Sequence, residues 1–188
     1  MVLKNNISEA TYVIKALSKF ESKILEISDL ILPLFSSGGK ILICGNGGSA
    51  ADAQHIAAEF VGRYRIERPA LPAIALSTDS SALTAISNDY GYEQVFSRQI
   101  EALGSKGDIL LCISTSGNSL NIIKAIEAAT AKKMRTITFL GNGGGELKNK
   151  GDYEFIVESS ITARIQEAHI FLAHNLCELI DNKFAGTT

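Results

Sequence analysis

Residues 110–119 read LLCISTSGNS, an apolar strand that runs directly into hydroxyl side chains and a glycine, and a helical pattern follows at once. The apolar half predicts a buried strand, and Gly117 allows the backbone to approach a ligand closely. Backbone N–H groups and the positive end of the next helix dipole would then face an anion. The hydroxyls of Ser114, Ser116 and Ser119 can donate to phosphate oxygens. The stretch indicates a phosphate cradle, and an ordinary serine-capped strand-to-helix turn is the alternative.

The alternation of strand and helix continues on both sides of this stretch. Short apolar strands are expected at residues 40–44, 73–76, 109–113, 136–140 and 154–157, with helical runs near residues 50–61, 92–103, 120–131 and 161–183. Strands that alternate with helices form a parallel sheet with right-handed crossovers, so that helices cover both faces. We therefore predict an α/β fold whose ligands bind at the carboxyl ends of the strands.

The composition indicates one globular domain. With 188 residues, 46% of them hydrophobic and 20% charged, the chain can bury a full core without disulfides or a metal. We expect a single domain over residues 1–188, with a helical region at residues 1–37 and an α/β core at residues 38–188. The formal net charge of −2 suggests no nucleic-acid partner, and no apolar run reaches the roughly 18 residues that a membrane span requires.

The cysteines give information about the cellular compartment of the protein. Cys44, Cys112 and Cys177 are odd in number and lie far apart in apolar segments, which is typical of buried, reduced thiols. The N-terminus lacks the basic and apolar regions of a secretion signal. These features predict a cytoplasmic protein.

Apolar residues follow one helical seam near the N-terminus. Steps of four and three residues relate Val13, Leu17, Phe20, Ile24, Ile27, Ile31 and Leu34. One long amphipathic helix or a hairpin of two helices fits this pattern, and Pro33 ends or kinks it. The seam can cover the core of its own chain, but a period near 3.5 residues also suits the matching helix of another subunit. We favour oligomerisation.

Two glycine-rich segments follow predicted strands. Residues 45–50 (GNGGSA) match a loose dinucleotide-binding pattern, but such a site needs an acidic residue about 20 positions on, and Asp79 comes too late. Residues 141–145 (GNGGG) form the second segment. Neither is followed by the lysine of a nucleoside triphosphate-binding loop. Two strand-loop-helix turns with exposed N–H groups fit a small phosphorylated ligand better.

Titratable side chains recur at helical spacing. His55 and Glu59 are four residues apart, so they lie about 40° apart on one helix face. This spacing suits two metal ligands or a carboxylate base held by an imidazole, and equally a surface hydrogen-bonded pair. In the last helix, Gln166 and His174 lie about 80° apart and can line one cavity. A histidine on that apolar helix can also be a core residue.

Several separated motifs occur in one order along the chain. They are residues 44–49 (CGNGGS) with Asp52, His55 and Glu59; residues 62–64 (GRY); Asn88 and Asp89; residues 113–119 (ISTSGNS); and residues 164–167 (RIQE) with His169 and His174. Together they resemble the motifs of the bacterial phosphoheptose isomerases, in register over residues 38–182.

This resemblance implies the sugar-isomerase (SIS) fold, a Rossmann-like five-stranded parallel sheet with helices on both faces. It also implies a homotetramer with active sites at subunit interfaces. The implied reaction converts sedoheptulose 7-phosphate, a phosphorylated seven-carbon sugar, into D-glycero-D-manno-heptose 7-phosphate. This aldose–ketose isomerisation is the first step of ADP/GDP-heptose biosynthesis for lipopolysaccharide or surface polysaccharide.

The resemblance assigns roles by position. Glu59 would be the general base and His174 the partner acid or base, because moving a proton between C1 and C2 requires such groups. The residues implied to hold the phosphate are Ser114, Thr115, Ser116 and Ser119. Those implied to contact the sugar are Asn46, Gly47, Gly48, Glu59, Asn88, Asp89 and Gln166.

Family members are also described with a zinc ion, held by residues that match His55, Glu59, Gln166 and His174. Such an ion could polarise the substrate carbonyl. A carboxylate bound to zinc is a poor proton acceptor, and amides are weak zinc ligands, so we expect partial or displaceable occupancy. Catalysis by Glu59 and His174 is the preferred interpretation.

Two other functions remain open within the same fold. Residues 83–86 (LTAI), 163–166 (ARIQ) and 179–182 (LIDN) resemble a non-catalytic SIS relative that binds the bacterial replication initiator, and Ala163 stands where many isomerases have an aspartate. Those relatives lack counterparts of Glu59 and His174, so isomerase is the better interpretation. A sugar-phosphate-sensing regulator is the third possibility, but the chain has no evident DNA-binding segment.

Overall fold

The computed structural model describes residues 1–186 and confirms the α/β class. Five parallel strands form one sheet in the order β2-β1-β3-β4-β5. Their bounds are β1 (Ile41–Gly45), β2 (Ala73–Ala75), β3 (Ile109–Ser114), β4 (Arg135–Leu140) and β5 (Tyr153–Ile156). Because β1 and β3 are neighbours, with Gly45 opposite Ile113, the loops that follow these two strands begin side by side.

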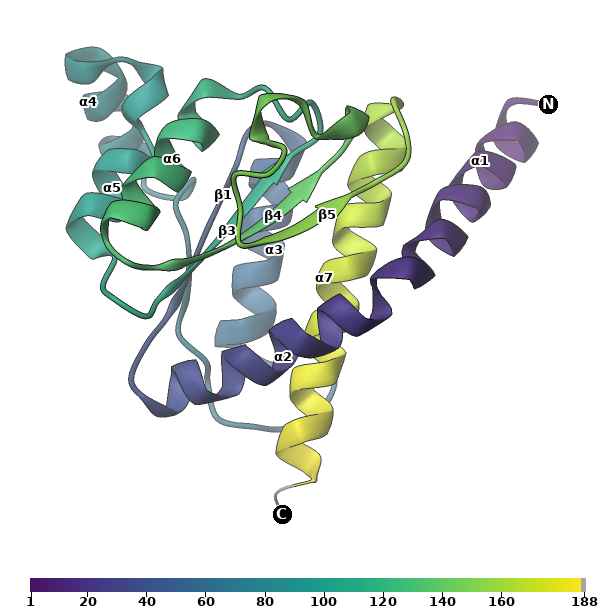
Figure 1. Cartoon of the computed structure of the whole chain (residues 1–188), viewed down its shortest axis with the longest axis horizontal. Coiled ribbons are helices and arrows are strands. Elements are labelled where there is room, and N and C mark those ends of the chain that lie inside the picture. Colours follow the sequence, from purple (N-terminus) through teal and green to yellow (C-terminus); the bar gives the residue numbers. More distant parts are fainter. Residues whose placement is uncertain (187–188) are drawn as a thin grey trace.

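Helices cover both faces of the sheet (Figure 1). On one face lie α2 (Glu21–Ser36), α3 (Gly48–Val61) and α7 (Thr162–Ala185), and on the other lie α5 (Ser97–Leu103) and α6 (Leu120–Ala131). Within residues 1–186, no helix combines the length and apolar content that crossing a membrane requires.

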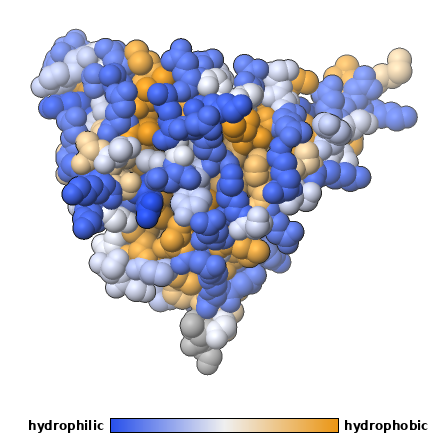
Figure 2. Space-filling view, viewed as in Figure 1, coloured by the Kyte–Doolittle hydropathy of each residue, from blue (hydrophilic) through white to orange (hydrophobic). Residues whose placement is uncertain are grey.

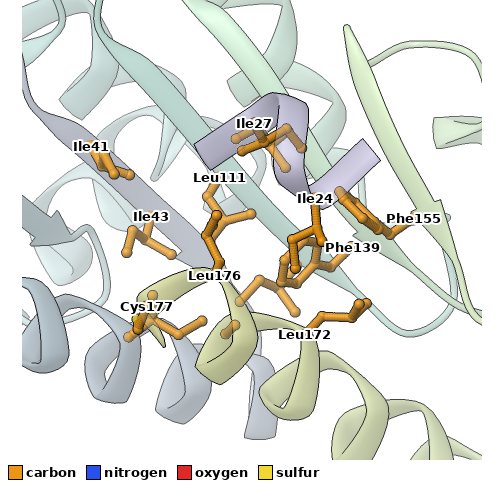
Figure 3. Packing of buried hydrophobic residues seen from close by; sticks show 14 of the residues in the cluster. Ile24, Ile27, Ile41, Ile43, Leu111, Phe139, Phe155, Leu172, Leu176 and Cys177 are labelled. Carbon is orange, nitrogen blue, oxygen red and sulfur yellow. The ribbon is translucent and has the colours of Figure 1, made fainter. Parts of the chain in front are cut away.

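Along β1 and β3, successive side chains alternate between two hydrophobic clusters. Ile41 and Ile43 of β1 join the cluster beneath α2, α3 and α7, whereas Leu42 and Cys44 join the cluster beneath α5 and α6. Figure 3 shows the first cluster, where Phe139 packs edge-on against Phe155, with ring centroids 5.2 Å apart. All three cysteines are free and buried, in agreement with the expected reduced thiols.

The residues of the N-terminal apolar seam lie on two consecutive helices and on the bend between them. A 3-10 turn (Leu17–Phe20) joins α1 (Val2–Ala16) to α2, and α1 continues outward from the body instead of folding back (Figure 1). The hairpin alternative is therefore wrong. Val13 is the one buried residue of α1, and hydrophobic side chains stand exposed at its tip (Figure 2).

One helix was not expected from the sequence. Residues 80–90 form α4 (Ser80–Tyr90), in which no residue is fully buried and the apolar pattern is short, with Leu83 and Ile86 partly buried against the core. A local cap starts it instead, because Asp79 Oδ1 accepts a hydrogen bond from the Ala82 N–H at 2.9 Å. The helical run expected at residues 92–103 divides into a 3-10 turn (Tyr92–Gln94) and α5.

The second glycine-rich segment does not open an α-helix, which corrects the expected strand-loop-helix turn. Residues 142–147 form an irregular 3-10 segment (Asn142–Leu147) that leads to β5. Gly143, Gly144 and Gly145 have φ values of 75°, 93° and 52°, which lie outside the helical region. This segment therefore presents no helix dipole to an anion.

Candidate active site

The cradle of hydroxyl groups is one compact turn between β3 and α6. Ser114, the last residue of β3, is buried, and its Oγ accepts a hydrogen bond from the Gly117 N–H at 3.1 Å. The Oγ atoms of Ser114 and Ser119 are 3.3 Å apart, and Ser116 Oγ accepts from the Asn118 N–H at 3.2 Å. A hydroxyl that accepts such a bond still has a proton to donate, so the turn retains its capacity to bind an anion.

The second glycine-rich segment braces this cradle. Gly117 has a φ of +69°, and a Cβ there would lie 2.1 Å from the carbonyl oxygen of Gly144. The Leu147 N–H donates to the Gly117 carbonyl oxygen at 2.9 Å, and the Glu146 N–H donates to Asn118 Oδ1 at 2.9 Å. The shape of the cradle therefore depends on a loop that the sequence places about 25 residues further on.

Asn46 links the first glycine-rich loop to the helix that follows the cradle. Its side-chain amide exchanges two hydrogen bonds of 2.9 Å with the amide of Asn121 on α6. Its Oδ1 also accepts from the hydroxyl of Tyr92 at 2.9 Å. Neither Asn121 nor Tyr92 was identified from the sequence, because both contacts join distant segments and no spacing signals them.

Gln166 of α7 lies against the start of α3. A Cβ on Gly48 would stand 2.2 Å from Gln166 Nε2, so the absence of a side chain at Gly48 makes room for this amide. The preceding Gly47 has a φ of +55°, which favours glycine. The structure thus brings Gln166 next to Gly48, which the resemblance grouped with it among the expected sugar contacts.

Three side chains from α3 and α7 converge on one point. His55 Nε2 lies 3.0 Å from Glu59 Oε1 and 3.5 Å from His174 Nε2. The ligand atoms of all three residues lie within 4.8 Å of one another. His55 and Glu59 share a helix face as their spacing predicted, and the packing of α7 beside α3 adds His174. We call these three residues the titratable cluster.

The environment of His174 favours the neutral imidazole. Partial burial lowers the pKa of His174, the nearby His55 lowers it further, and Glu59 opposes both effects. Two protonated imidazoles with Nε2 atoms 3.5 Å apart would repel each other. The cluster therefore places an imidazole that favours its neutral form close to the side chain of Glu59.

Asp52 and His169 do not belong to this cluster. Burial raises the pKa of Asp52 while His55 lowers it, and Asp52 Oδ2 is buried without a hydrogen-bond partner among the described residues. His169 is fully buried, and its Nε2 donates to the carbonyl oxygen of Leu140 at 3.1 Å. Burial lowers the pKa of His169 to about 4, so this histidine is a neutral core residue.

Asn88 and Asp89 are not brought to the titratable cluster. Both lie exposed on α4, where Asn88 Nδ2 donates to Asp89 Oδ1 at 2.8 Å. The partly buried residues of α4 pack on the cluster beneath α5 and α6, on the opposite face of the sheet from α7. Their contact with a sugar stays a prediction.

The titratable cluster fits a metal ion by its chemistry. Two imidazoles and a carboxylate are common zinc ligands, with bond lengths of about 2.0–2.2 Å, and here their ligand atoms lie within 4.8 Å of one another. His55, Glu59 and His174 could therefore hold a divalent cation.

Comparison with known proteins agrees with this architecture. The model of the SIS domain family matches residues 7–141. The phosphoheptose isomerase of Helicobacter pylori is 54% identical over 171 residues, which cover 91% of this chain and 89% of that protein. The phosphoheptose isomerase of Aliarcobacter butzleri is 48% identical over 184 residues, with coverage of 98% and 97%.

Solved structures show the same similarity. Phosphoheptose isomerase GmhA from Neisseria gonorrhoeae superimposes with a TM-score of 0.88 at 44% identity, covering 96% of this chain and 97% of that one. The Vibrio vulnificus NanR protein complexed with ManNAc-6P has a TM-score of 0.67 at 14% identity, covering 99% of this chain and 64% of that one. This second likeness shows the fold alone.

Proposed function

Because this chain belongs to the phosphoheptose isomerases of the SIS-domain family, we propose that it converts sedoheptulose 7-phosphate into D-glycero-D-manno-heptose 7-phosphate. This aldose–ketose isomerisation would supply ADP/GDP-heptose for lipopolysaccharide or surface polysaccharide. The observation that carries the proposal is the convergence of Glu59 and His174, the two residues whose counterparts a non-catalytic relative is expected to lack.

Glu59 is the proposed general base of this reaction. Its carboxylate removes the proton from the carbon next to the carbonyl group, and the resulting enediol then receives a proton at the neighbouring carbon. His174 is the proposed partner that exchanges a proton with the substrate oxygens. Its lowered pKa supports this role, since a neutral imidazole can accept a proton as well as donate one after protonation.

The hydroxyl cradle is proposed to bind the phosphate. Ser114, Thr115, Ser116 and Ser119 border the N-terminus of α6, where free N–H groups and the helix dipole favour an anion. The proposed sugar contacts are Asn46, Gly47, Gly48, Glu59, Asn88, Asp89 and Gln166.

A zinc ion is proposed at the titratable cluster, held by His55, Glu59 and His174. Gln166, the weaker amide ligand of the proposed set, lies against Gly48 in this chain, so it would reach such an ion only from a neighbouring subunit. When bound, such an ion would polarise a carbonyl group as a Lewis acid. Because Glu59 cannot bind zinc firmly and accept a proton equally well, we infer that the ion occupies the site partially or exchanges readily. Proton transfer by Glu59 and His174 is the preferred mechanism.

A homotetramer with shared active sites is part of this proposal. Val2, Leu3 and Ile7 of α1 are exposed, and an open groove of about 460 Å³ between α1, α2 and α7 has a mostly apolar lining. Glu59 follows Gly48 by eleven residues, or about 16 Å along α3 at 1.5 Å per residue, which is longer than a seven-carbon chain. The exposed apolar surface supports association of subunits, and the separation of Gly48 from Glu59, both proposed sugar contacts, supports sites that two subunits complete together.

The proposed compartment is the cytoplasm. The three buried, unpaired cysteines are consistent with a reducing environment. The net charge of −2 gives no support to a nucleic-acid partner.

The decisive experiment is an isomerisation assay with sedoheptulose 7-phosphate and the purified full chain, with and without added zinc or a chelator. The Glu59→Gln variant serves as the blank, since the amide retains the shape of the side chain but cannot act as a base. Turnover that disappears in the variant supports the enzyme and its base. An inactive, folded oligomer under every metal condition would overturn the proposal in favour of a binding or sensing protein.

A further inference from the structure

The segment between α3 and β2, residues 62–72, is anchored beneath the titratable cluster by a buried arginine. Arg68 is buried, and its Nη2 and Nη1 donate to the carbonyl oxygens of Glu59 at 2.7 Å and of Phe60 at 3.0 Å. Its Nε donates to Asp181 Oδ1 on α7 at 2.8 Å. One guanidinium therefore joins the end of the helix that carries Glu59 to the helix that carries His174.

The side chain of Asp181 also binds the backbone of this segment. Its Oδ2 accepts hydrogen bonds from the N–H groups of Arg65 at 2.8 Å and Ile66 at 3.2 Å. The side chains of Arg68 and Asp181 are 1% and 2% exposed, so water competes little for these bonds. Residues 65–68 are thereby fixed to α7, and the residue just before them has a defined position.

That residue is Tyr64, and its ring stacks on the imidazole of His174. The ring centroids are 5.4 Å apart and the planes meet at 25°. His55 contacts the same imidazole edge-on, with centroids 5.1 Å apart at 72°. Two aromatic neighbours therefore limit the rotation of His174, whose Nε2 lies 3.5 Å from His55 Nε2.

The sequence placed Tyr64 in a recognised motif without giving it a role. Its ring is half-buried, and burial, followed by the charge of Glu178, raises the pKa of its hydroxyl, so the side chain stays neutral. A neutral aromatic face suits stacking on an imidazole in either protonation state.

We propose that Tyr64 is a positioning residue for His174: its ring, held by the Arg68–Asp181 anchor, stacks on the imidazole and directs it toward the reacting atoms. This inference rests on the proposed function, in which His174 exchanges a proton with the substrate. It predicts that the aromatic ring matters and the hydroxyl does not.

The test compares Tyr64→Leu with Tyr64→Phe and with Glu67→Ala, a control in the same segment whose side chain is 91% exposed. We expect Tyr64→Leu to lower kcat about tenfold to hundredfold with KM within about twofold, the range expected for a misplaced catalytic group. Tyr64→Phe should restore kcat to within about threefold of the wild type, and Glu67→Ala should leave both constants unchanged.

A second readout is spectroscopic. In the chelator-treated protein, the carbon-bound imidazole protons of His174, assigned with a His174→Gln variant, should show the upfield ring-current shift of a stacked aromatic ring. The shift should persist in Tyr64→Phe and disappear in Tyr64→Leu. Tyr64→Gln replaces Tyr64→Leu if the leucine variant does not fold, as judged by circular dichroism.

Several outcomes would overturn the proposal. They are unchanged kcat in the leucine variant, a raised KM at unchanged kcat, a phenylalanine variant as impaired as the leucine variant, or His174 shifts that do not respond to Tyr64. If the wild type itself does not turn over sedoheptulose 7-phosphate, the proposed function fails and the positioning role fails with it. If the wild type is active, these outcomes remove the role of Tyr64 alone.

Discussion

The hydroxyl cradle and the titratable cluster differ in how far apart their residues lie in the chain. The cradle is a single turn, residues 114–119, whose side chains bond to the N–H groups of the same turn. The cluster joins His55 of α3 to His174 of α7, 119 residues later. A local turn can be recognised from its residues, whereas a cluster of this kind exists only once two helices have packed on the same face of the sheet.

The largest effect should come from the titratable cluster. Glu59→Gln is expected to lower kcat about a hundredfold to ten-thousandfold, because a general base contributes that much, while binding of the sugar phosphate at the cradle survives. Turnover assays and calorimetric titration with substrate separate the two effects. Glu67→Gln, an exposed glutamate, is the control. Retained turnover in Glu59→Gln would remove Glu59 as the base and weaken the division between the two regions.

The anchor beneath the cluster should matter most for stability. Asp181→Ala leaves the buried Arg68 without its carboxylate partner, which is expected to lower the free energy of unfolding by about 3–5 kcal/mol. Urea denaturation measures the loss. Glu178→Ala, which removes an exposed ion pair with Arg65, should cost at most about 1 kcal/mol. Equal effects of the two variants would contradict the buried anchor.

The same pair predicts a pH dependence. Burial acts to raise the pKa of Asp181, but hydrogen bonds from the Arg65 N–H, Arg68 and the Ile66 N–H outweigh it and hold this pKa below 3.8. A carboxyl with a lower pKa in the folded state stabilises at higher pH and loses that contribution as pH falls through the folded value. The stability difference between wild type and Asp181→Ala should therefore be constant near neutral pH and shrink below pH 3.8. A stability difference between the two proteins that grows as the pH falls would contradict a lowered pKa for Asp181.

The cradle should be sensitive to its contacts with the distant loop at residues 142–147. Gly117→Ala forces a positive φ on alanine and drives its Cβ into the Gly144 carbonyl, so we expect a loss of stability of roughly 1–3 kcal/mol and weaker substrate binding. Gly107→Ala is the matched control, since Gly107 has a φ of +92° with open space around its Cβ position. If both variants lose the same stability, the contacts of Gly117 with residues 142–147 contribute nothing beyond the strain of a positive φ.

The smallest effect should come from a single hydroxyl of the cradle. Ser119→Ala removes one proposed phosphate contact, which would be equally strong in the ground state and the transition state, so KM should rise up to about tenfold with kcat nearly unchanged. Steady-state kinetics with sedoheptulose 7-phosphate measure both constants, and Ser105→Ala, outside the site, is the control. A fall in kcat at constant KM would show that the cradle takes part in the chemistry.

Elements that carry periodic apolar residues were predicted well from the sequence. The five strands and α6 lie where the pattern places them, because burial on the sheet requires that pattern. The sequence did not predict α4, since none of its residues is buried, or the 3-10 segment at residues 142–147, since glycines can open a helix or a tight turn equally well. Contacts such as Asn46 with Asn121, or Arg68 with Asp181, leave no spacing signal at all.

The sequence by itself determined the α/β class, the hydroxyl cradle and the pairing of His55 with Glu59, because each depends on residues within a few positions of one another. The tertiary structure decided that α7 lies beside α3, which brings His174 to Glu59, and that residues 142–147 support the cradle. It also decided that Tyr64 stacks on His174. The physical reason is that local propensity acts through the dihedral angles of neighbouring residues. These contacts instead depend on which face of each helix is buried against the sheet.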